Sequence, residues 1–377
     1  MIAAAAHIVI TGGGTGGHLF PGIAIARAFQ RRLAGAAILF VGTGRELERR
    51  VVKEAGYRHA VLKVQGLKGM GFFRQLRSLV RLPGALLHAG TILWRFRPAV
   101  VVGVGGYAAG PVCLAAWMMH IPVCLQEQNS LPGITNRLLA RLARRIYTSF
   151  SESQGHFPVE KIMLTGNPVR EEIIALGRKN TPRDPDQRFT LLVAGGSQGA
   201  RNVNTAVIDM LPHIDAPRSL EVIHQSGIED QERVRKAYAA AGIKARTEAF
   251  FSDMDRQYAR ADLVICRAGA TTVAELTCAG LPAIFIPLPH AADNHQEINA
   301  RALVDAGAGE MIREADLSGE ILWQRIRELR DTPGRLEEMA ARARELGHPE
   351  AADTIVADIV HEFLQPTSPF GRPEIGR

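Results

Sequence analysis

The sequence predicts an α/β protein made of two doubly wound domains, each with a parallel sheet covered by helices. At 377 residues the chain exceeds the roughly 250–300 residues over which one core grows. Short apolar runs alternate with longer helical segments, which is the pattern of a parallel sheet with helices on both faces. The pattern also restarts after a polar, proline-containing stretch at residues 165–187, which we interpret as an interdomain connection.

The first half opens with the apolar run HIVI, a glycine-rich loop and the helical segment GIAIARAFQRRLA. A second apolar run, AILFVGT, precedes the polar helix RELERRVVKEAG. AVVVGVGG predicts the next buried strand, PVCLAAWMMH a helix and PVCLQEQN a further strand. Strands this continuously apolar are buried on both faces. We assign residues 1–169 to a first Rossmann-like domain.

The second half repeats this order. FTLLVAGGSQGARNVNTAVIDML predicts a strand, a glycine loop and a helix, and EVIHQSG, DLVICRAGATTVAELTCAG and PAIFIPLP continue the alternation. We assign residues 170–349 to a second Rossmann-like domain that faces the first across a cleft. A helix at about 350–365 has apolar residues at helical spacing and could pack back onto the first domain. The proline-rich tail, 366–377, is expected to be disordered.

Composition narrows the class of partner. Lysine and arginine exceed the acidic residues by 7, and the sequence pI is about 9.5. A basic surface can attract nucleic acid, anionic lipid or a phosphorylated substrate. A nucleic-acid-binding protein is disfavoured, because the basic cluster is interleaved with aliphatic residues and no nucleic-acid motif is present. The four cysteines form no CxxC pair and lie in apolar segments, so we expect buried, reduced thiols.

No targeting or membrane-spanning segment is expected. The N-terminus has no basic region ahead of its apolar run, unlike a signal peptide. Residues 98–126 carry no formal charge and are long enough for a span. GVGGYAAGP and IP, however, divide this stretch into strand, loop, helix and strand.

The first glycine loop has the spacing of a phosphate-binding turn. Gly12, Gly14 and Gly17 fit G-x-G-x-x-G between a strand and a helix, where backbone N–H groups can approach an anion. A tight strand-to-helix turn without a ligand is the alternative. A dehydrogenase is poorly supported, because the second strand ends in glycines and Arg45 rather than in an acidic residue.

Three further glycine loops take the same strand-to-helix position, at residues 103–110, 195–200 and 267–275. In open α/β sheets, ligands bind at that edge. The helix start after Gly269, with Thr271 and Thr272, would suit a diphosphate. Glu275, one turn further on, could accept two ribose hydroxyls or simply face solvent. GGSQGA offers N–H groups and the Ser197 hydroxyl to a phosphate or a uracil.

A polar patch follows the strand PAIFIPLP. Amides and carboxylates gathered there suit the hydroxyls of a sugar, although an ordinary capped helix start explains them too. The patch consists of Asp293, Asn294, His295, Gln296 and Asn299.

Taken in order, TGGGTGGHLFPGIAIA, GGYAAGPVCLAAW, QEQNSLPGITNRLLA, TGNPVR, GGSQGARNVN and RAGATTVAEL…GLPAIFIPLPHAADNHQ closely resemble the MurG family of bacterial glycosyltransferases. The resemblance implies a GT-B fold. It implies inverting, metal-independent and cofactor-free transfer of N-acetylglucosamine from UDP-GlcNAc to the muramoyl C4 hydroxyl of lipid I, giving lipid II and UDP. A GT-B transferase with another lipid or soluble acceptor, and a UDP-GlcNAc 2-epimerase, remain alternatives.

The resemblance also implies which residues hold the donor. His295 stands where the family often has a first of two adjacent glutamines, so its role is open. The implied donor-binding residues are Thr15, Gly16, Gly17, Asn129, Arg170, Ser197, Phe251, Ala270, Thr271, Thr272, Val273, Glu275 and Gln296.

Inversion by direct displacement requires a base for the proton of the acceptor hydroxyl. His18, at the rim of the first loop, is our first candidate, because an unperturbed imidazole titrates near pH 6.5. Capping of the following helix, or a bond to a phosphate of lipid I, would explain this histidine as well. Glu127 is the second candidate for the base.

The acceptor implied by the resemblance is a polyprenyl diphosphate lipid, so the first domain should touch an anionic membrane surface. Residues 66–98 interleave Arg95 and Arg97 and other basic residues with Phe72, Phe73 and Trp94. Such a segment could lie in a membrane interface, or its apolar residues could face the core. We expect a peripheral protein at the cytoplasmic face of the inner membrane, with proteins of the cell-wall and division machinery as further partners.

Overall fold

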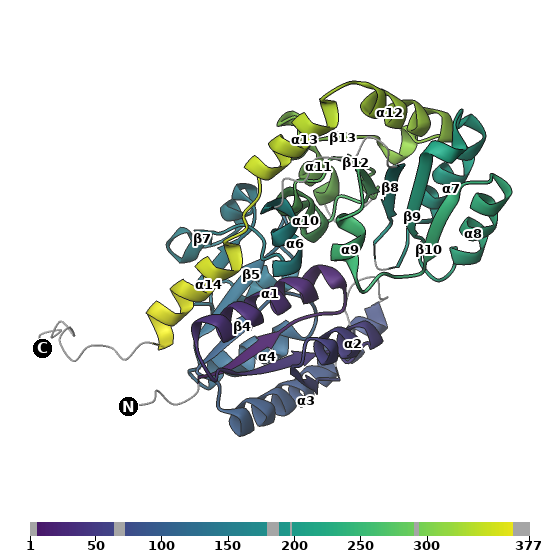
Figure 1. Cartoon of the computed structure of the whole chain (residues 1–377). Coiled ribbons are helices and arrows are strands. Elements are labelled where there is room, and N and C mark those ends of the chain that lie inside the picture. Colours follow the sequence, from purple (N-terminus) through teal and green to yellow (C-terminus); the bar gives the residue numbers. More distant parts are fainter. Residues whose placement is uncertain (1–5, 64–71, 179–187, 197, 290–293, 365–377) are drawn as a thin grey trace, which may run out of the picture.

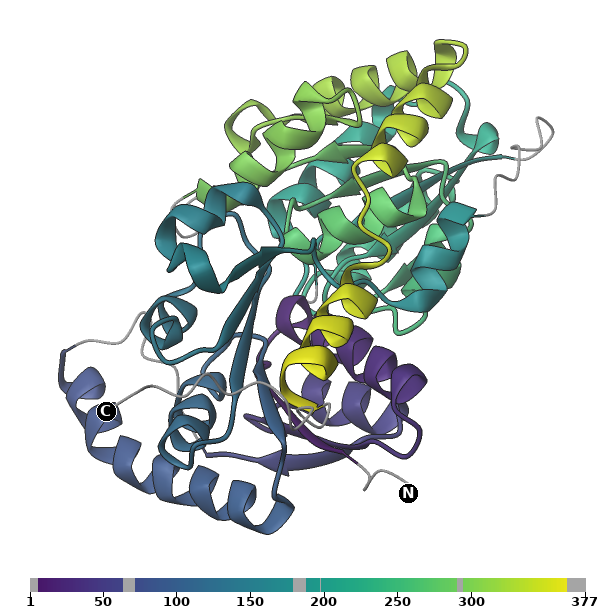
Figure 2. The same ribbon diagram turned by 90° about the vertical axis from the view of Figure 1, so that its left-hand side faces the viewer.

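The structure, a computed structural model, describes residues 6–63, 72–178, 188–196, 198–289 and 294–364, and it leaves the side chains of residues 72–82 undescribed. Two α/β lobes are joined by the chain near Val169 and by the segment at 346–350, through which the C-terminal part of the chain crosses back from the second lobe to the first (Figures 1 and 2). Ser197 and the tail at 366–377 lie outside the described residues.

The first lobe contains a parallel sheet of 7 strands in the order β3-β2-β1-β4-β5-β6-β7, which begins as a Rossmann sheet does. Its strands are β1 (His7–Thr11), β2 (Ala37–Gly42), β3 (Arg58–Val61), β4 (Val100–Gly103), β5 (Val123–Glu127), β6 (Arg145–Thr148) and β7 (Ile162–Leu164). Its helices are α1 (Gly16–Arg32), α2 (Glu46–Glu54), α3 (Phe72–Phe96), α4 (Ala109–Met118) and α5 (Ile134–Leu139), with 3₁₀ turns at Ser151–His156 and Val159–Lys161.

The second lobe contains a parallel sheet of 6 strands in the order β10-β9-β8-β11-β12-β13. Its strands are β8 (Phe189–Ala194), β9 (Leu220–Gln225), β10 (Lys244–Glu248), β11 (Leu263–Cys266), β12 (Ala283–Phe285) and β13 (Gly309–Met311). Its helices are α6 (Glu171–Arg178), α7 (Arg201–Met210), α8 (Gln231–Ala240), α9 (Met254–Tyr258), α10 (Ala270–Ala279), α11 (His295–Asp305), α12 (Gly319–Asp331) and α13 (Arg335–Glu345), with 3₁₀ turns at Leu211–His213, Pro217–Ser219 and Glu314–Asp316.

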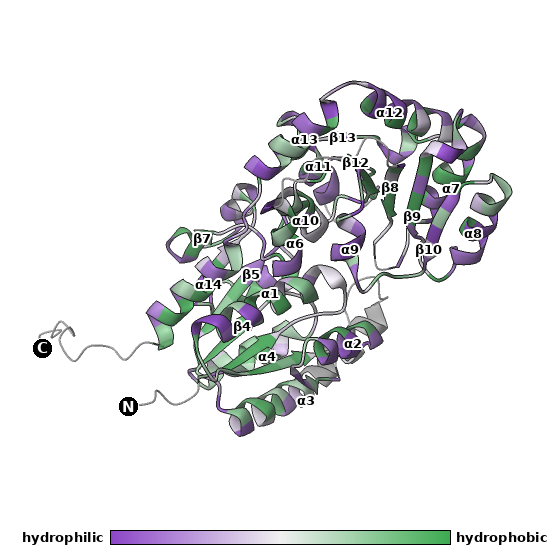
Figure 3. Ribbon diagram, viewed as in Figure 1, coloured by the Kyte–Doolittle hydropathy of each residue, from purple (hydrophilic) through white to green (hydrophobic). Residues whose placement is uncertain are grey.

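The centre of each sheet is buried on both faces, because its central strands are apolar along most of their length. Along β1, Ile8 and Ile10 enter one core cluster and Val9 enters the cluster on the opposite face. Central strands such as β4 and β8 are accordingly hydrophobic, whereas the edge strand β10 and helices α2, α8 and α13 carry hydrophilic residues (Figure 3). All four cysteines are buried free thiols, and burial raises the pKa of Cys113 to about 12. Among the described residues, no helix has both the length and the apolarity to span a membrane.

The C-terminal helix belongs to the core of the first lobe. Helix α14 (Ala351–Ile359) continues as one π-helical turn, Val360–Leu364, and packs against α1 (Figure 2). Ile355 and Ile359 are fully buried there beside Ile8 and Ile10. Asp358 accepts a hydrogen bond from the hydroxyl of the buried Tyr147 at 2.7 Å. The chain therefore completes its first lobe with residues from its far end.

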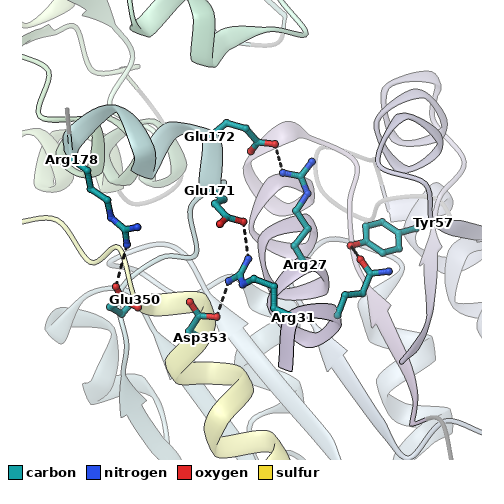
Figure 4. A network of polar contacts seen from close by, with 9 residues as sticks. Arg27, Arg31, Tyr57, Glu171, Glu172, Arg178, Glu350 and Asp353 are labelled. Carbon is teal, nitrogen blue, oxygen red and sulfur yellow. Dashed lines mark hydrogen bonds and ion pairs between the residues drawn. The ribbon is translucent and has the colours of Figure 1, made fainter. Parts of the chain in front are cut away.

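Ion pairs also connect the lobes along α1 (Figure 4). Arg27 pairs with Glu172 of α6, and Arg31 lies 3.0 Å from Glu171 of α6 and 2.7 Å from Asp353 of α14. These side chains are partly exposed, so each pair is worth about 0–1 kcal/mol. Helix α6 lies within the stretch that we predicted as a polar connection. It is amphipathic, and its Ile173 enters the core of the second lobe.

His224 of β9 makes the stability of the second lobe depend on pH. Its Nδ1 lies 2.8 Å from the Tyr238 hydroxyl and its Nε2 lies 3.0 Å from Asn204 Oδ1, in a fully buried site. Burial lowers the pKa of His224 from 6.5 to about 3. The unfolded chain therefore binds the proton first, and the stability present above pH 6.5 is lost as pH falls toward 3.

We expect this histidine alone to reduce the free energy of unfolding by about 2 kcal/mol between pH 7.5 and pH 5. Urea unfolding of the wild type and of His224→Gln at both pH values measures it, because all other titrating groups are common to the two proteins. The wild type should lose about 2 kcal/mol more than the variant. Equal losses would contradict the prediction.

Candidate active site

A cleft of about 760 Å³ lies between the lobes, at the carboxyl ends of the central strands of both sheets. Most of the residues predicted to bind the donor line it, together with the predicted base. The predicted residues that line the cleft are Thr15, Gly16, Gly17, His18, Asn129, Arg170, Phe251, Ala270, Thr271, Thr272, Glu275 and Gln296.

The first glycine loop contributes to the cleft only where it becomes α1. The carboxylate of Glu48 is buried beside this loop, where it accepts hydrogen bonds from Thr43 Oγ1 at 2.8 Å and from the N–H of Gly44 at 2.8 Å. The earlier amides bond within the protein: Gly12 N–H donates to Val41 O at 3.2 Å, Gly13 N–H to Gly105 O at 3.3 Å and Gly14 N–H to the Glu48 carboxylate. The amides left for an anion are those of the first turn of α1, starting at Gly16.

The loop at 103–110 supports the first loop from behind. A Cβ at Gly12 would lie 2.4 Å from Gly105 O, and a Cβ at Gly106 would lie 2.4 Å from Gly13 O. Two glycine backbones therefore pass closer together than any side chain allows. Of the glycine loops predicted to meet at one cleft, those at 195–200 and 267–275 line it with α1, and the loop at 103–110 holds α1 in place.

Helix α10 directs its N-terminus into the cleft. Gly269, Ala270, Thr271 and Thr272 line the wall there, and the first amides of the helix are the groups that bind anions best. The Thr271 hydroxyl donates to Gly17 O at 2.8 Å, so the N-termini of α1 and α10 touch across the lobes. The site thus presents two helix N-termini to one space.

Val273 differs from its neighbours on α10. It is buried in the core of the second lobe with Leu276 and does not line the cleft. A helix presents one face to the cleft, and positions 271, 272 and 275 occupy that face. We therefore correct its assignment from donor-binding residue to core residue.

Glu275 and Arg170 form a buried pair at the base of the cleft. Arg170 Nη2 lies 2.8 Å from Glu275 Oε1, and the Tyr258 hydroxyl donates to Glu275 Oε2 at 3.1 Å. Burial raises the pKa of Tyr258 well above its usual value, so the phenol stays a donor. The Arg170 guanidinium also lies 4.2 Å from the centre of the Phe20 ring on α1. This arginine contacts both lobes at once.

Two other donor-side residues are held by hydrogen bonds of the second lobe. The Phe251 N–H donates to Gln225 Oε1 at 2.9 Å, so a nucleobase at this residue would meet its carbonyl oxygen. Gln296 Oε1 accepts from the N–H of Leu288 at 3.0 Å. Of the predicted sugar-binding patch, Asn299 is buried with its amide on Ala268 O, and Asp293 lies outside the described residues.

Glu127 does not reach the cleft, and this corrects its proposed role as a second candidate base. Its side chain is 1% exposed and accepts four hydrogen bonds from the loop that follows it and from α5. The donors are Asn129 N–H at 3.0 Å, Asn129 Nδ2 at 3.2 Å, Gly133 N–H at 3.1 Å and Asn136 Nδ2 at 2.9 Å. With both carboxylate oxygens bonded in this way, Glu127 shapes the loop and orients Asn129 at the cleft.

His18 is the titratable side chain of α1 that lines the cleft. Its Nδ1 lies 2.9 Å from Oε1 of Gln128, a cleft residue that the sequence did not suggest. Sequence reasoning also missed Glu48, Phe20 and Tyr258. Among the described residues, no three His, Cys, Asp or Glu side chains are grouped as metal ligands.

The comparisons agree with this two-lobed site. Residues 8–148 match the glycosyltransferase family 28 N-terminal domain and residues 190–355 match the C-terminal domain of that family. A relative from Myxococcus xanthus (strain DK1622), named UDP-N-acetylglucosamine--N-acetylmuramyl-(pentapeptide) pyrophosphoryl-undecaprenol N-acetylglucosamine transferase, is 49% identical over 97% of this chain and 95% of its own length.

Solved structures give the same result. The crystal structure of Acinetobacter baumannii MurG is 31% identical, with a TM-score of 0.73 over 94% of this chain and 99% of that one. The UDP-GlcNAc 2-epimerase from Neisseria meningitidis has a TM-score of 0.65 over 95% of this chain and 100% of its own, but is 13% identical and shares the fold alone. The predicted GT-B architecture is confirmed. The chain belongs to glycosyltransferase family 28, in the group that includes MurG.

Proposed function

We propose that this protein transfers N-acetylglucosamine from UDP-GlcNAc to the C4 hydroxyl of the muramoyl group of lipid I, with inversion, giving lipid II and UDP. The proposal is supported by full-length similarity to relatives named for this reaction. The observation that carries it is the contact of α1 and α10 at the cleft, where His18 of one lobe lies near the anion-binding helix start of the other.

The second lobe would hold the donor. The N-terminus of α10, with Thr271 and Thr272, suits the diphosphate, and Glu275 has a further lone pair on each oxygen for the ribose hydroxyls. Phe251 would contact the uracil and Gln296 the sugar. Charge that develops on the departing UDP would be stabilised by preorganised backbone N–H groups of α10 and α1.

The first lobe would supply the base. The acceptor oxygen attacks the anomeric carbon and forms the new glycosidic bond, while the bond from that carbon to the β-phosphate oxygen breaks and its electron pair leaves with UDP. The hydroxyl proton passes to a ring nitrogen of His18, which becomes an imidazolium. The proton is then on His18, the electron pair on UDP and the sugar on the acceptor, so the step requires no cofactor.

A panel of donors and acceptors tests the function. We expect UDP release with UDP-GlcNAc and lipid I, in EDTA as well as without it, and formation of lipid II. Release with diacylglycerol or a small alcohol instead would indicate a different acceptor. Epimer formation without any acceptor would indicate a UDP-GlcNAc 2-epimerase. Loss of turnover in EDTA would overturn the metal-independent part of the proposal.

The first lobe has a surface suited to the membrane that carries the acceptor. On α3, Leu87 is 76% exposed and Trp94 is 65% exposed, seven residues apart and so on one face. Helix α4 packs beside α3 and exposes Trp117, and α5, which packs against α4, exposes Leu138. Exposed arginines stand close in sequence to these apolar side chains, at Arg95, Arg97, Arg137 and Arg141. An anionic lipid surface suits this combination of charge and apolar area. The side chains of Phe72 and Phe73 lie outside the described residues.

Replacing Leu87 and Trp94 together by serine should weaken binding to anionic vesicles by about tenfold or more, since burying either side chain is worth about 1.5–3 kcal/mol. Sedimentation with vesicles containing phosphatidylglycerol measures the effect. Ile228→Ser is the matched control, because Ile228 is 78% exposed on the second lobe. Undiminished binding of the double variant would exclude this surface.

A further inference from the structure

The ring of His18 is fixed on two sides. Gln128 Oε1 lies 2.9 Å from Nδ1, and Gly105 packs against the ring, where a Cβ would stand 2.9 Å from Nδ1 and 3.0 Å from Cε1. Gly105 has a φ of +89°, a conformation that favours glycine. The ring therefore has one orientation. Which of its nitrogens carries the proton in the neutral form depends on whether the oxygen or the nitrogen of the Gln128 amide faces Nδ1.

The orientation of the Gln128 amide follows from its other partner. One of its terminal atoms lies 2.8 Å from Val104 O, a carbonyl oxygen that can only accept, so that atom is the NH₂ nitrogen. The nitrogen also donates to Gln126 Oε1. Gln128 is 2% exposed, and reversing its amide would place an oxygen against two acceptors. Its oxygen must face His18.

The chain of hydrogen bonds continues from Gln126 to the second lobe with the same donor-to-acceptor direction. Gln126 Nε2 donates to Asn167 Oδ1 at 3.2 Å, and Asn167 Nδ2 is 3.5 Å from Thr271 Oγ1. Thr271 donates in turn to Gly17 O at 2.8 Å, one residue before His18. Every donor points in one direction along this chain, and it ends on a carbonyl oxygen that cannot donate. The hydrogen-bond network thus admits one arrangement of protons.

We propose that Gln128 is a positioning residue that holds His18 as the Nδ1–H tautomer, so that Nε2 is the atom that receives the acceptor's proton. An amide oxygen accepts only, and therefore requires a proton on Nδ1. When Nε2 is protonated, the Nδ1–H bond to Gln128 becomes charge-assisted and stabilises the imidazolium. The inference rests on the proposed function for the use of the proton but not for the tautomer.

The tautomer is measured directly by ¹⁵N NMR of histidine-labelled protein, with the His18 signal identified by its absence from His18→Gln. The wild type should show Nδ1 protonated and Nε2 bare at a pH above the titration of the ring. Gln128→Leu, which removes the acceptor oxygen, should move His18 toward the Nε2–H form. An Nε2–H ring in the wild type, or an unchanged Nδ1–H ring in Gln128→Leu, would overturn the proposal.

Kinetics give the second readout. Gln128→Leu should lower kcat about 10- to 100-fold, as is typical when the partner that orients a reacting histidine is lost, with the KM for UDP-GlcNAc within about twofold. Gln257→Leu is the control for the loss of a buried amide, because Gln257 is 1% exposed and does not line the cleft. It should leave both the His18 tautomer and kcat unchanged.

The two proposals fail separately. A wild type that makes no lipid II but whose His18 tautomer depends on Gln128 would refute the proposed function alone. A wild type that makes lipid II while Gln128→Leu keeps both tautomer and kcat would refute the role of Gln128 alone.

Discussion

Replacing His18 with alanine is expected to lower kcat by about 10²–10⁴-fold, the usual cost of losing an acid–base group, with little change in the affinity for UDP-GlcNAc. The reason is positional. His18 belongs to the first lobe, whereas the groups that suit the nucleotide, such as Glu275 and the start of α10, belong to the second. Steady-state kinetics with lipid I, and calorimetric titration of the donor, measure the two effects.

The controls separate chemistry from folding. Alanine at position 18 leaves Gln128 Oε1 without its partner, which costs about 1–3 kcal/mol, so thermal unfolding of the variant is measured alongside. His18→Gln fills the same space and should be as slow as His18→Ala. Near-normal turnover in either variant would remove His18 from the chemistry.

Replacing Glu275 with alanine should affect both donor binding and stability. The carboxylate holds Arg170 and Tyr258 through bonds of 2.8 Å and 3.1 Å, and Arg170 Nε already lacks a partner among the described residues. Removing one member of a buried ion pair costs about 3–5 kcal/mol because the other charge stays buried. Two lost bonds from charged oxygen to the ribose should raise the donor KM by about 10²-fold or more.

Glu171→Gln provides the matched comparison, since it removes one carboxylate charge from an exposed pair with Arg31. It should change the free energy of unfolding by about 0–1 kcal/mol and leave the donor KM unaltered. The measurements are urea unfolding and initial rates at a temperature where every variant is folded. A Glu275→Ala protein with normal donor KM would contradict the ribose assignment, and one with unchanged stability would contradict the buried pair.

Local sequence was enough to predict the central strands and the position of the cleft. Runs such as LLVA within FTLLVA and IVI within HIVI are apolar without alternation, as expected for a strand that is covered on both faces. The edge strands β3, β10 and β13 were not predicted, because RHAV, KARTE and GEM are short and partly polar. Their pairing depends on a neighbour that sequence patterns do not reveal.

Some site residues could likewise be predicted from local sequence, and others depend on contacts that form only in the fold. Glycine loops can be recognised in the sequence, because few residues other than glycine let the backbone approach a ligand or another backbone segment closely. The burial of Glu127 and Glu48 could not be foreseen, because both stand in polar stretches and only the folded loops supply their donors. Gln128 gives no signal of its own either, since its role comes from Val104 and His18, which meet it only in three dimensions.

The return of α14 to the first lobe sets an order of events during synthesis. A ribosome releases the N-terminal sheet long before residues 351–360, which cover its apolar face, have been made. Until then that face is open to other chains, so the lobe that is translated first is finished last. A gene cut between the two lobes would therefore yield a first half without the helix that covers this apolar face.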